Sequence, residues 1–546
     1  MLLIGLDMVP DGELSHHSKE VAKGSFWSFL GNAFYKLISF FYVVLLARAA
    51  SQDDVGLFFL SFSIVGIIMM FSDFGLPNSL QRFVPFFEGR DERGKILSLL
   101  NANYLIVTVA GIIFTAALFS QADNIGLIYK NQQLPDAIRI LSPLILFGSI
   151  FKIHIMYLQG RAAVREMQFM QNMQNFLKLA LTAGLFYLFG PSAVTIAAGL
   201  VLSNLVLLPL SQAYVNRSSA GLEAKSVSLS DEELRDLLPF GFLLSVINSI
   251  AVIIVSYDKI LLGYLAPPET ASQLVAIYSI ATTLSLVLTM FPYSIEVIFF
   301  PTISRLVGKN DFQQIREATD TAQRWSLMVT IPIAVAMILA SEELLVLIYG
   351  PAYRAGALAM SITTLGFMIR AFSSALSITL AAMRKLKLEF VTYLIVALSN
   401  LLFGLLLIPS YGMEGAAAAS VIGFCLMLLL FAYYSHKAFG FSFKPGILKL
   451  ALCGLLAFTL VLIVKTGVQD AFPGTGGGAD AARAPALLSL SIVSGLSLAA
   501  FCAFVIAARC LHKEDVALLG TVLRKARLPQ PLSQAILKTA SLGVHG

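Results

Sequence analysis

The amino-acid sequence predicts an all-α integral membrane protein with about fourteen transmembrane helices, arranged as two six-helix lobes related by a parallel repeat, plus two C-terminal helices. Of the 546 residues, 57% are hydrophobic and 13% are charged. This is about half the charged share of a soluble domain. A globule this apolar could not cover its surface with polar groups, so much of the chain must face lipid. The composition therefore disfavours a soluble enzyme and a nucleic-acid-binding protein.

Fourteen apolar stretches are each long enough to cross a hydrocarbon core of about 30 Å as a helix, which bonds its backbone groups internally. They lie at residues 24–46, 55–77, 99–120, 137–159, 170–189, 192–215, 240–264, 274–299, 323–341, 355–383, 388–408, 412–436, 446–465 and 485–508. The segment before the first stretch is polar, so we expect an uncleaved first helix and not a removable signal sequence.

The distribution of Lys and Arg predicts the orientation of these helices. When residues within four positions of a helix end are counted with the adjacent loop, 27 of the 38 Lys and Arg residues fall in the N-terminus, the even-numbered loops and the C-terminal tail, whereas 6 fall in the odd-numbered loops. Positively charged loops stay in the cytoplasm. We therefore expect a multi-pass protein of the cytoplasmic (plasma) membrane with both termini cytoplasmic. This topology explains the net charge of +6, so no nucleic-acid partner is expected.

The sequence repeats itself with a period of about 215 residues. The stretch 24–95 matches 241–316, and Gly148 with Lys152 matches Gly366 with Arg370. Both copies start on the same side, which is typical of transporters with a site between two halves. The expected segments are a cytoplasmic N-terminus (1–23), an N-lobe (24–215), a cytoplasmic linker (216–239), a C-lobe (240–436), two further helices (437–508) and a cytoplasmic tail (509–546).

Five cations lie more than four residues from the ends of the predicted helices: Lys36, Lys152, Lys178, Lys259 and Arg370. Each would cost roughly 2.5 to 3.5 kcal/mol if it faced lipid. Each must therefore face a watery cavity, pair with a carboxylate or reach the interface. Lys36, Lys152 and Arg370 lie well inside their helices, so we expect them to face a cavity.

Polar residues share helix faces with these cations. Asn32 lies four residues before Lys36, and Gln174 lies four residues before Lys178, so each pair shares a face. A polar stripe with helical spacing also runs through residues 278–296. Such residues line either a cavity or a tight helix contact, because small polar residues are common in both.

Three carboxylates, Asp73, Asp258 and Glu296, lie close enough to the bilayer to pair with a cation or to bind a coupling ion, Na⁺ or H⁺. Asp73 can also be interpreted as a cap or turn residue before Gly75. The four cysteines show no zinc spacing, so neither a metal site nor a cofactor is expected. A cavity with several cations and few carboxylates suits an anion, and phosphate or pyrophosphate is the natural candidate.

Several short motifs follow one another along the chain. They are A-S-Q-D-D-V-G-L-F-F-L (50–60), D-F-G-L-P-N-S-L-Q-R-F (73–83), D-K-I-L-L-G (258–263), F-P-T-I-S-R-L (300–306), Y-G-P-A-Y (349–353) and G-M-E-G-A-A-A-A (412–419). In this order they resemble the motifs of oligosaccharide flippases of the polysaccharide biosynthesis family, within the group of multidrug, oligosaccharidyl-lipid and polysaccharide exporters. The resemblance covers about residues 18–440.

This resemblance implies a V-shaped pair of lobes that open alternately to each side and move a polyprenyl-phosphate- or diphosphate-linked oligosaccharide. The implied partners are this lipid-linked oligosaccharide, membrane lipids, and the polysaccharide polymerase or glycosyltransferases of the same pathway. By similarity to lipid-linked peptidoglycan precursor flippases, the last two helices could form a groove for the polyprenyl tail. The family does not assign the cavity cations, which rest on the local pattern alone.

Two other functions compete with this interpretation. A multidrug or cation antiporter of the same superfamily usually has twelve helices and more acidic sites, whereas we expect fourteen helices and a cationic bias. A membrane glycosyltransferase or ligase that uses a lipid-linked sugar commonly needs positioned carboxylates or a metal near the membrane surface. The short outer loops offer few carboxylates.

Overall fold

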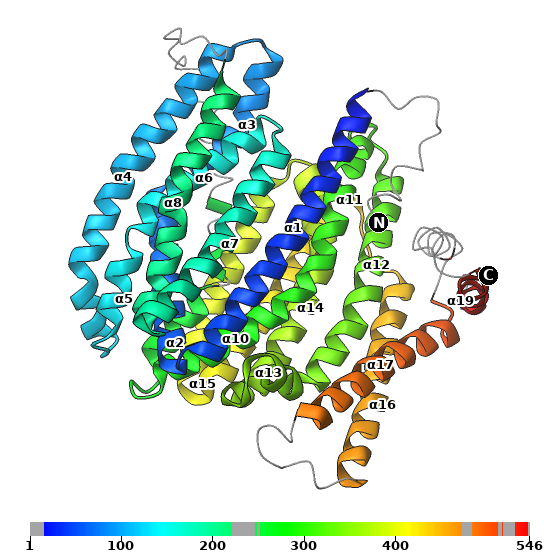
Figure 1. The fold of residues 1–546 in the computed structure, drawn as a ribbon. Coiled ribbons are helices and arrows are strands. Elements are labelled where there is room, and N and C mark those ends of the chain that lie inside the picture. Colours follow the sequence, from blue (N-terminus) through cyan, green and yellow to red (C-terminus); the bar gives the residue numbers. More distant parts are fainter. Residues whose placement is uncertain are drawn as a thin grey trace. The chain divides into compact units, whose positions relative to one another are not determined.

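The computed structural model describes residues 16–220, 256–471, 483–510 and 530–543, with isolated positions at 246, 247, 250, 252–254 and 516. Within these residues every regular element is a helix (Figure 1). The predicted all-α class is therefore confirmed. Most of the predicted N-terminus (1–23), linker (216–239) and tail (509–546) lies outside the described residues.

Eleven helices in the described part of the chain are long and apolar enough to cross a membrane. Two predicted spans run together in α15 (Leu386–Phe439), which is interrupted at Gly412, where φ is 54°. The fifth predicted span corresponds to α7 (Val164–Phe189), whose first half is polar. These helices agree with a multi-pass membrane protein, whereas the count of fourteen stays a prediction.

The chain divides into two compact units, of which the N-terminal unit comprises residues 23–280 and 393–416. Besides α7 it contains most of α1 (His16–Ala49), α2 (Gln52–Ser72), α3 (Leu76–Gly89), α4 (Arg93–Ile128), α5 (Leu134–Leu141), α6 (Leu144–Gly160), α8 (Ala193–Ser219) and the start of α10 (Ala271–Ser285). Helix α6 packs against α2, α3, α4, α7 and α8. It is therefore the central helix of this unit.

Glycines allow the helices of the N-terminal unit to approach one another closely. A Cβ built on Gly160 of α6 would lie 2.6 Å from the carbonyl oxygen of Leu80 on α3. A Cβ built on Gly56 of α2 would lie 1.8 Å from the carbonyl oxygen of Ser272 on α10. Membrane helices commonly pack through small residues in this way, so neither position accepts a larger side chain without moving a helix.

The C-terminal unit comprises residues 1–22, 281–392 and 417–546. Its described helices are the end of α10, η1 (Leu286–Thr289), α11 (Met290–Gly308), α12 (Phe312–Leu339), α13 (Ser341–Tyr349), η2 (Pro351–Gly356), α14 (Ala357–Ala382), both ends of α15, α16 (Pro445–Ala471), α17 (Arg483–Ala507) and α19 (Gln530–Leu542). Helix α12 packs against α11, α14, α16 and α17. It has the central place here that α6 has in the N-terminal unit.

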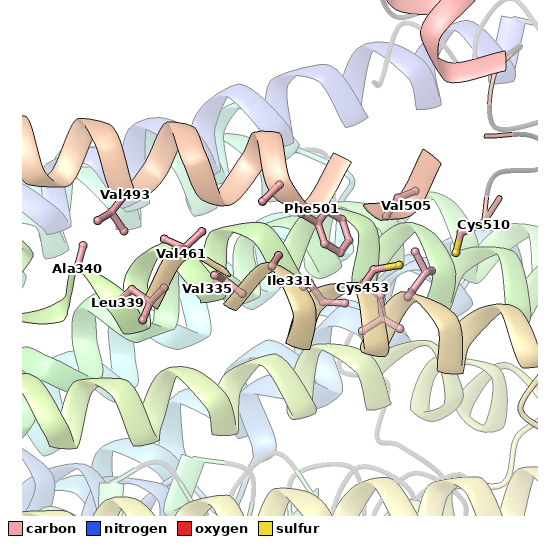
Figure 2. Close-up of a cluster of buried hydrophobic side chains, with 14 of the residues drawn as sticks. Ile331, Val335, Leu339, Ala340, Cys453, Val461, Val493, Phe501, Val505 and Cys510 are labelled. Atoms are coloured by element: carbon pink, nitrogen blue, oxygen red, sulfur yellow. The ribbon is translucent and has the colours of Figure 1, made fainter. Parts of the chain in front are cut away.

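The two helices that follow the sequence repeat, α16 and α17, attach to α12 through a cluster of buried apolar side chains (Figure 2). The cluster includes Ile331, Val335 and Leu339 of α12, Cys453 and Val461 of α16, and Val493, Phe501 and Val505 of α17. An ion pair adds to this contact, since Lys465 Nζ of α16 lies 2.8 Å from Glu343 Oε1 of α13. The helix pair is therefore part of the C-terminal unit.

Candidate functional site

The transmembrane helix predicted at 55–77 is broken at Asp73, between α2 and α3. Phe74 has a φ of 44° and Gly75 a φ of 65°, both in the left-handed region. The Asp73 side chain closes this turn, because its Oδ1 accepts a hydrogen bond from the Gly75 N–H at 2.7 Å. The interpretation of Asp73 as a turn residue is therefore confirmed.

Asp73 also pairs with Lys152, one of the predicted intramembrane cations. Lys152 Nζ lies 2.7 Å from Asp73 Oδ2, and the side chains of Lys152 and Asp73 are 32% and 2% exposed. A buried carboxylate without a counter-charge would be costly. The ion pair therefore explains how both charges are tolerated inside the helix bundle.

Helix α6 brings Lys152 to the break because it packs along α2. A Cβ built on Gly148, one turn before Lys152, would lie 3.0 Å from Cε of Met69, one turn before Asp73. Residues four positions apart share a helix face. One turn after Met69 and Gly148, the facing residues on α2 and α6 are therefore Asp73 and Lys152. A small residue at 148 lets the two helices approach and form the ion pair.

The predicted residues Lys36 and Asn32 lie on α1. This helix contacts α7 through Tyr42 and through Gly31, whose carbonyl oxygen accepts a hydrogen bond from Asn172 at 3.1 Å. At about 100° per residue, Lys36 lies about 140° round the helix from Gly31 and about 40° from Asn32. Lys36 is exposed. The ammonium group therefore lies on the side of α1 that faces away from α7.

The predicted residues on α7, Gln174 and Lys178, contact neighbouring helices. Gln174 Nε2 donates a hydrogen bond to Asn204 Oδ1 of α8 at 2.7 Å. Lys178 Nζ lies 4.3 Å from the centre of the Tyr42 ring on α1. An aromatic face stabilises a nearby cation, which explains the half-buried position of Lys178. Both residues thus join α7 to its neighbours.

Arg370 lies on α14 of the C-terminal unit, at the place in the repeat that Lys152 occupies in the first half. Its Cζ lies 5.8 Å from the centre of the Phe424 ring on α15. Gly366, one turn earlier, packs closely, because a Cβ there would lie 3.1 Å from side-chain atoms of both Phe424 and Val421. Each half therefore places a glycine one turn before a cation, but the cation contacts a carboxylate in one half and a ring in the other.

Asp258 is a second buried carboxylate of the N-terminal unit, with 3% exposure. Its Oδ2 accepts a hydrogen bond from the Tyr278 hydroxyl at 2.5 Å, and its Oδ1 accepts one from the Lys259 N–H at 2.9 Å. Lys259 Nζ lies 6.0 Å from the centre of the Phe59 ring. The side chain of Glu296, on α11, lies outside the described residues.

The polar stripe predicted over residues 278–296 is buried between helices where its side chains are described. Tyr278, Thr282 and Ser285 are 0%, 3% and 0% exposed. The Oγ of Ser285 lies 2.9 Å from Oγ1 of Thr363 on α14. Of the two interpretations, the helix contact therefore applies to this part of the stripe.

Sequence reasoning missed a polar contact at the start of α2. Asp53 accepts hydrogen bonds from Ser272 Oγ at 2.5 Å and from Gln273 Nε2 at 3.1 Å, and Asp54 accepts one from the Ala193 N–H at 2.8 Å. These bonds join the starts of α2, α8 and α10. The two acids stand in the motif at residues 50–60, but their partners lie 139 to 220 residues away. No local sequence pattern can indicate partners at that separation.

Known families and proteins match this chain over most of its length. The family model described as "Polysaccharide biosynthesis protein" matches residues 21–307, and the MatE model matches residues 269–406. The probable low-salt glycan biosynthesis flippase of Haloferax volcanii is 24% identical over 430 residues, which cover 78% of this chain and 85% of that protein.

Solved transporters share the fold. The lipid II flippase MurJ, in an inward closed conformation, matches with a TM-score of 0.68 at 17% identity and covers 88% of this chain and 98% of its own. An inward-facing multidrug resistance MATE family transporter of the MOP superfamily matches with a TM-score of 0.64 at 14% identity, over 80% and 97% of the two chains. The helices described above are therefore folded as in this group of membrane transporters.

The ion pair between Lys152 and Asp73 predicts a strong coupling between the two positions. Lys152→Gln alone should lower the free energy of unfolding by about 3 kcal/mol, the lower end of the range for breaking a buried pair, because Lys152 is partly exposed. The double variant Lys152→Gln/Asp73→Asn should recover most of that loss, since it leaves no unpaired buried charge. Thermal unfolding in detergent of the wild type, both single variants and the double variant measures the coupling. Additive losses would contradict the ion pair.

Proposed function

Because the chain belongs to the polysaccharide biosynthesis protein family, whose model matches residues 21–307, we propose that it is a flippase for a polyprenyl-phosphate- or diphosphate-linked oligosaccharide. It moves this or a related lipid-linked glycan across the cytoplasmic membrane by alternating access. The protein is thus a transporter and not an enzyme. The observation that carries the proposal is that three cations, Lys36, Lys152 and Arg370, lie on long apolar helices of the two units.

The similar proteins support a lipid-linked glycan as the substrate. The Haloferax volcanii relative is named a glycan biosynthesis flippase, and MurJ, which has the same fold, is named a lipid II flippase. Besides its lipid, the proposed substrate contains a polar sugar and a phosphate group. The phosphate is the part that a cation can recognise.

The three cations can bind a phosphate group because none of them is fully buried. Lys36 is exposed, the Lys152 side chain is 32% exposed, and Arg370 is half-buried beside Phe424. Arg binds phosphate through two parallel hydrogen bonds, whereas Lys acts as a compact charge. Asn32, about 40° round α1 from Lys36, is the proposed neighbouring contact for the sugar or the phosphate.

Gln174 and Lys178 have a supporting place in this proposal. They join α7 to α8 and to α1 through Asn204 and Tyr42, and α1 carries Lys36. Their substitution would therefore change the position of a substrate-binding helix before it removed a substrate contact.

Alternating access requires a contact that closes the transporter towards one side of the membrane. In the proposed topology the starts of α2, α8 and α10 lie on the extracytoplasmic side. The bonds from Ser272 and Gln273 to Asp53 join a helix of the first repeat to a helix of the second. We assign to this contact the closure of the extracytoplasmic side while the substrate enters from the cytoplasm.

The positive loops support a location in the plasma membrane with both termini in the cytoplasm. A flippase so placed takes its substrate from the enzymes that build the glycan on the inner surface. Its proposed partners are therefore the glycosyltransferases of the same pathway, and the polymerase that receives the glycan on the outer surface.

Substitution of the cations tests the proposed function. Arg370→Gln should lower transport at least tenfold, because loss of one charged hydrogen bond costs about 1.5 to 3 kcal/mol. Arg370→Lys should keep part of the activity, because it retains the charge and loses only the bidentate hydrogen bonding of the guanidinium group. Lys36→Gln should resemble Arg370→Gln. The measurement is transport of a fluorescent lipid-linked oligosaccharide in vesicles, normalised to the inserted protein.

The matched control is Arg354→Gln in the C-terminal unit. Arg354 is 70% exposed and pairs with Glu342 at 2.5 Å, so its loss removes one positive charge outside the proposed site. This control should transport at the wild-type rate. Wild-type transport by the Gln variants at both 36 and 370 would refute cation-dependent transport.

Coupling to an ion is proposed at Asp258 or Glu296. Asp258→Asn or Glu296→Gln should remove the response of transport to a Na⁺ or H⁺ gradient, because each neutral amide can no longer attract the ion. Asp320→Asn is the control, because Asp320 is also 3% exposed and lies 3.3 Å from Lys444 Nζ. Transport is measured in vesicles with an imposed gradient of one ion at a time. A wild-type gradient response in both variants would place coupling elsewhere.

A further inference from the structure

The contacts of Asp73 show that the ammonium group of Lys152 is engaged by a carboxylate. Both carboxylate oxygens of Asp73 are used: Oδ1 accepts from the Gly75 N–H and Oδ2 accepts from Lys152 Nζ, each at 2.7 Å. Asp73 is 2% exposed, so water screens its side of the pair little, whereas Lys152 is 32% exposed. A phosphate can therefore take the full charge of Lys152 only if it displaces this carboxylate.

We propose that the phosphate group of the substrate and the carboxylate of Asp73 compete for the ammonium group of Lys152. The inference rests on the proposed function. In the empty transporter Asp73 is a positioning residue that holds Lys152 beside the break between α2 and α3. In the loaded transporter Lys152 binds phosphate and Asp73 keeps only its bond to the Gly75 N–H.

The geometry lets a phosphate approach Lys152 from the side that Asp73 does not occupy. Lys152 remains 32% exposed while it is paired. Its ammonium group has three donors, and among the described residues its hydrogen-bonding partner is Asp73. A phosphate monoester, such as farnesyl phosphate, carries a charge of about −1.5 to −2 at pH 7 and three acceptor oxygens, and the diphosphate bridge of a lipid-linked glycan likewise carries more than one negative charge. It can therefore bind the open donors first and then outcompete the single charge of the carboxylate.

The depth of the pair matches the phosphate of a lipid in the cytoplasmic leaflet. Asp73 follows the 21 residues of α2, which span about 31 Å. This is about the thickness of the hydrocarbon core. In the proposed topology α2 begins on the extracytoplasmic side, so Asp73 and Lys152 lie at the inner edge of the core, where the substrate phosphate enters.

Release of Asp73 from Lys152 would allow a conformational change at the break between α2 and α3. Asp73 belongs to the turn that contains Phe74 and Gly75 in left-handed conformations. Beyond this turn α3 packs against α6 and α4. Breaks in membrane helices are places where transporters bind substrates and change shape. Loss of the bond between Lys152 and Asp73 frees α2 and α3 to change their mutual angle, which links phosphate binding to movement.

The test compares phosphate binding by the full-length wild type and by Asp73→Asn, both purified in detergent. The probe is farnesyl phosphate, followed by the quenching of tryptophan fluorescence or by native mass spectrometry. Removal of the competing charge should lower the Kd about tenfold, which corresponds to about 1.4 kcal/mol. Transport of the lipid-linked oligosaccharide should fall in the same variant, because the phosphate is released more slowly. A residue that only stabilised the fold would not tighten binding.

Two further variants keep the test decisive. Asp73→Ser retains an oxygen that can accept the Gly75 N–H, so it should also tighten binding if Asp73→Asn fails to fold. Asp320→Asn removes a buried, paired carboxylate in the C-terminal unit and should leave the Kd unchanged. Tighter binding in Asp320→Asn would show a general effect of charge and overturn the proposal.

Three ligands distinguish a lipid-linked phosphate from free phosphate and from the lipid chain alone. Farnesyl phosphate should bind more tightly than inorganic phosphate, and farnesol should show no gain in Asp73→Asn. An equal gain for farnesol would overturn the exchange. If the wild type binds farnesyl phosphate and neither Asp73 variant binds it more tightly, the exchange fails and the proposed function stands. If the wild type binds no farnesyl phosphate, both fail.

Discussion

A charge within a membrane-spanning helix must be paired, hydrogen-bonded or hydrated by water, and this constraint shapes both units of the protein. Lys152 meets it with the carboxylate of Asp73. Lys178 and Arg370 meet it with the aromatic faces of Tyr42 and Phe424. These partners differ in how firmly they hold the cation, because a carboxylate neutralises the charge whereas a ring only stabilises it.

The same constraint explains where helices are interrupted. The break between α2 and α3 places a backbone N–H at the Asp73 carboxylate, and η1 separates α10 from α11 close to the bonds of Ser285. Polar side chains satisfy or accompany these two interruptions, which a lipid-facing helix could not tolerate. These two interruptions therefore lie where polar groups gather.

The sequence predicted the helical membrane class and most helix positions, because apolar length and the positions of Lys and Arg are local signals. It also indicated Asp73 as a turn residue from the Gly and Pro that follow. It could not indicate that Lys152 pairs with Asp73, because the two are 79 residues apart. It also left the polar stripe at 278–296 open between cavity and packing. Helix periodicity shows that residues share a face, but it does not show what that face contacts.

The central claim is that cations inside this membrane protein bind the phosphate of a lipid-linked glycan. An experimental structure of the full chain with a polyprenyl-phosphate-linked oligosaccharide tests it most directly. The account predicts phosphate oxygens within hydrogen-bonding distance of Lys152 Nζ, and a distance from Lys152 Nζ to Asp73 Oδ2 well above the 2.7 Å described here. A bound phosphate that contacts none of Lys36, Lys152 and Arg370, with the pair intact, would contradict it.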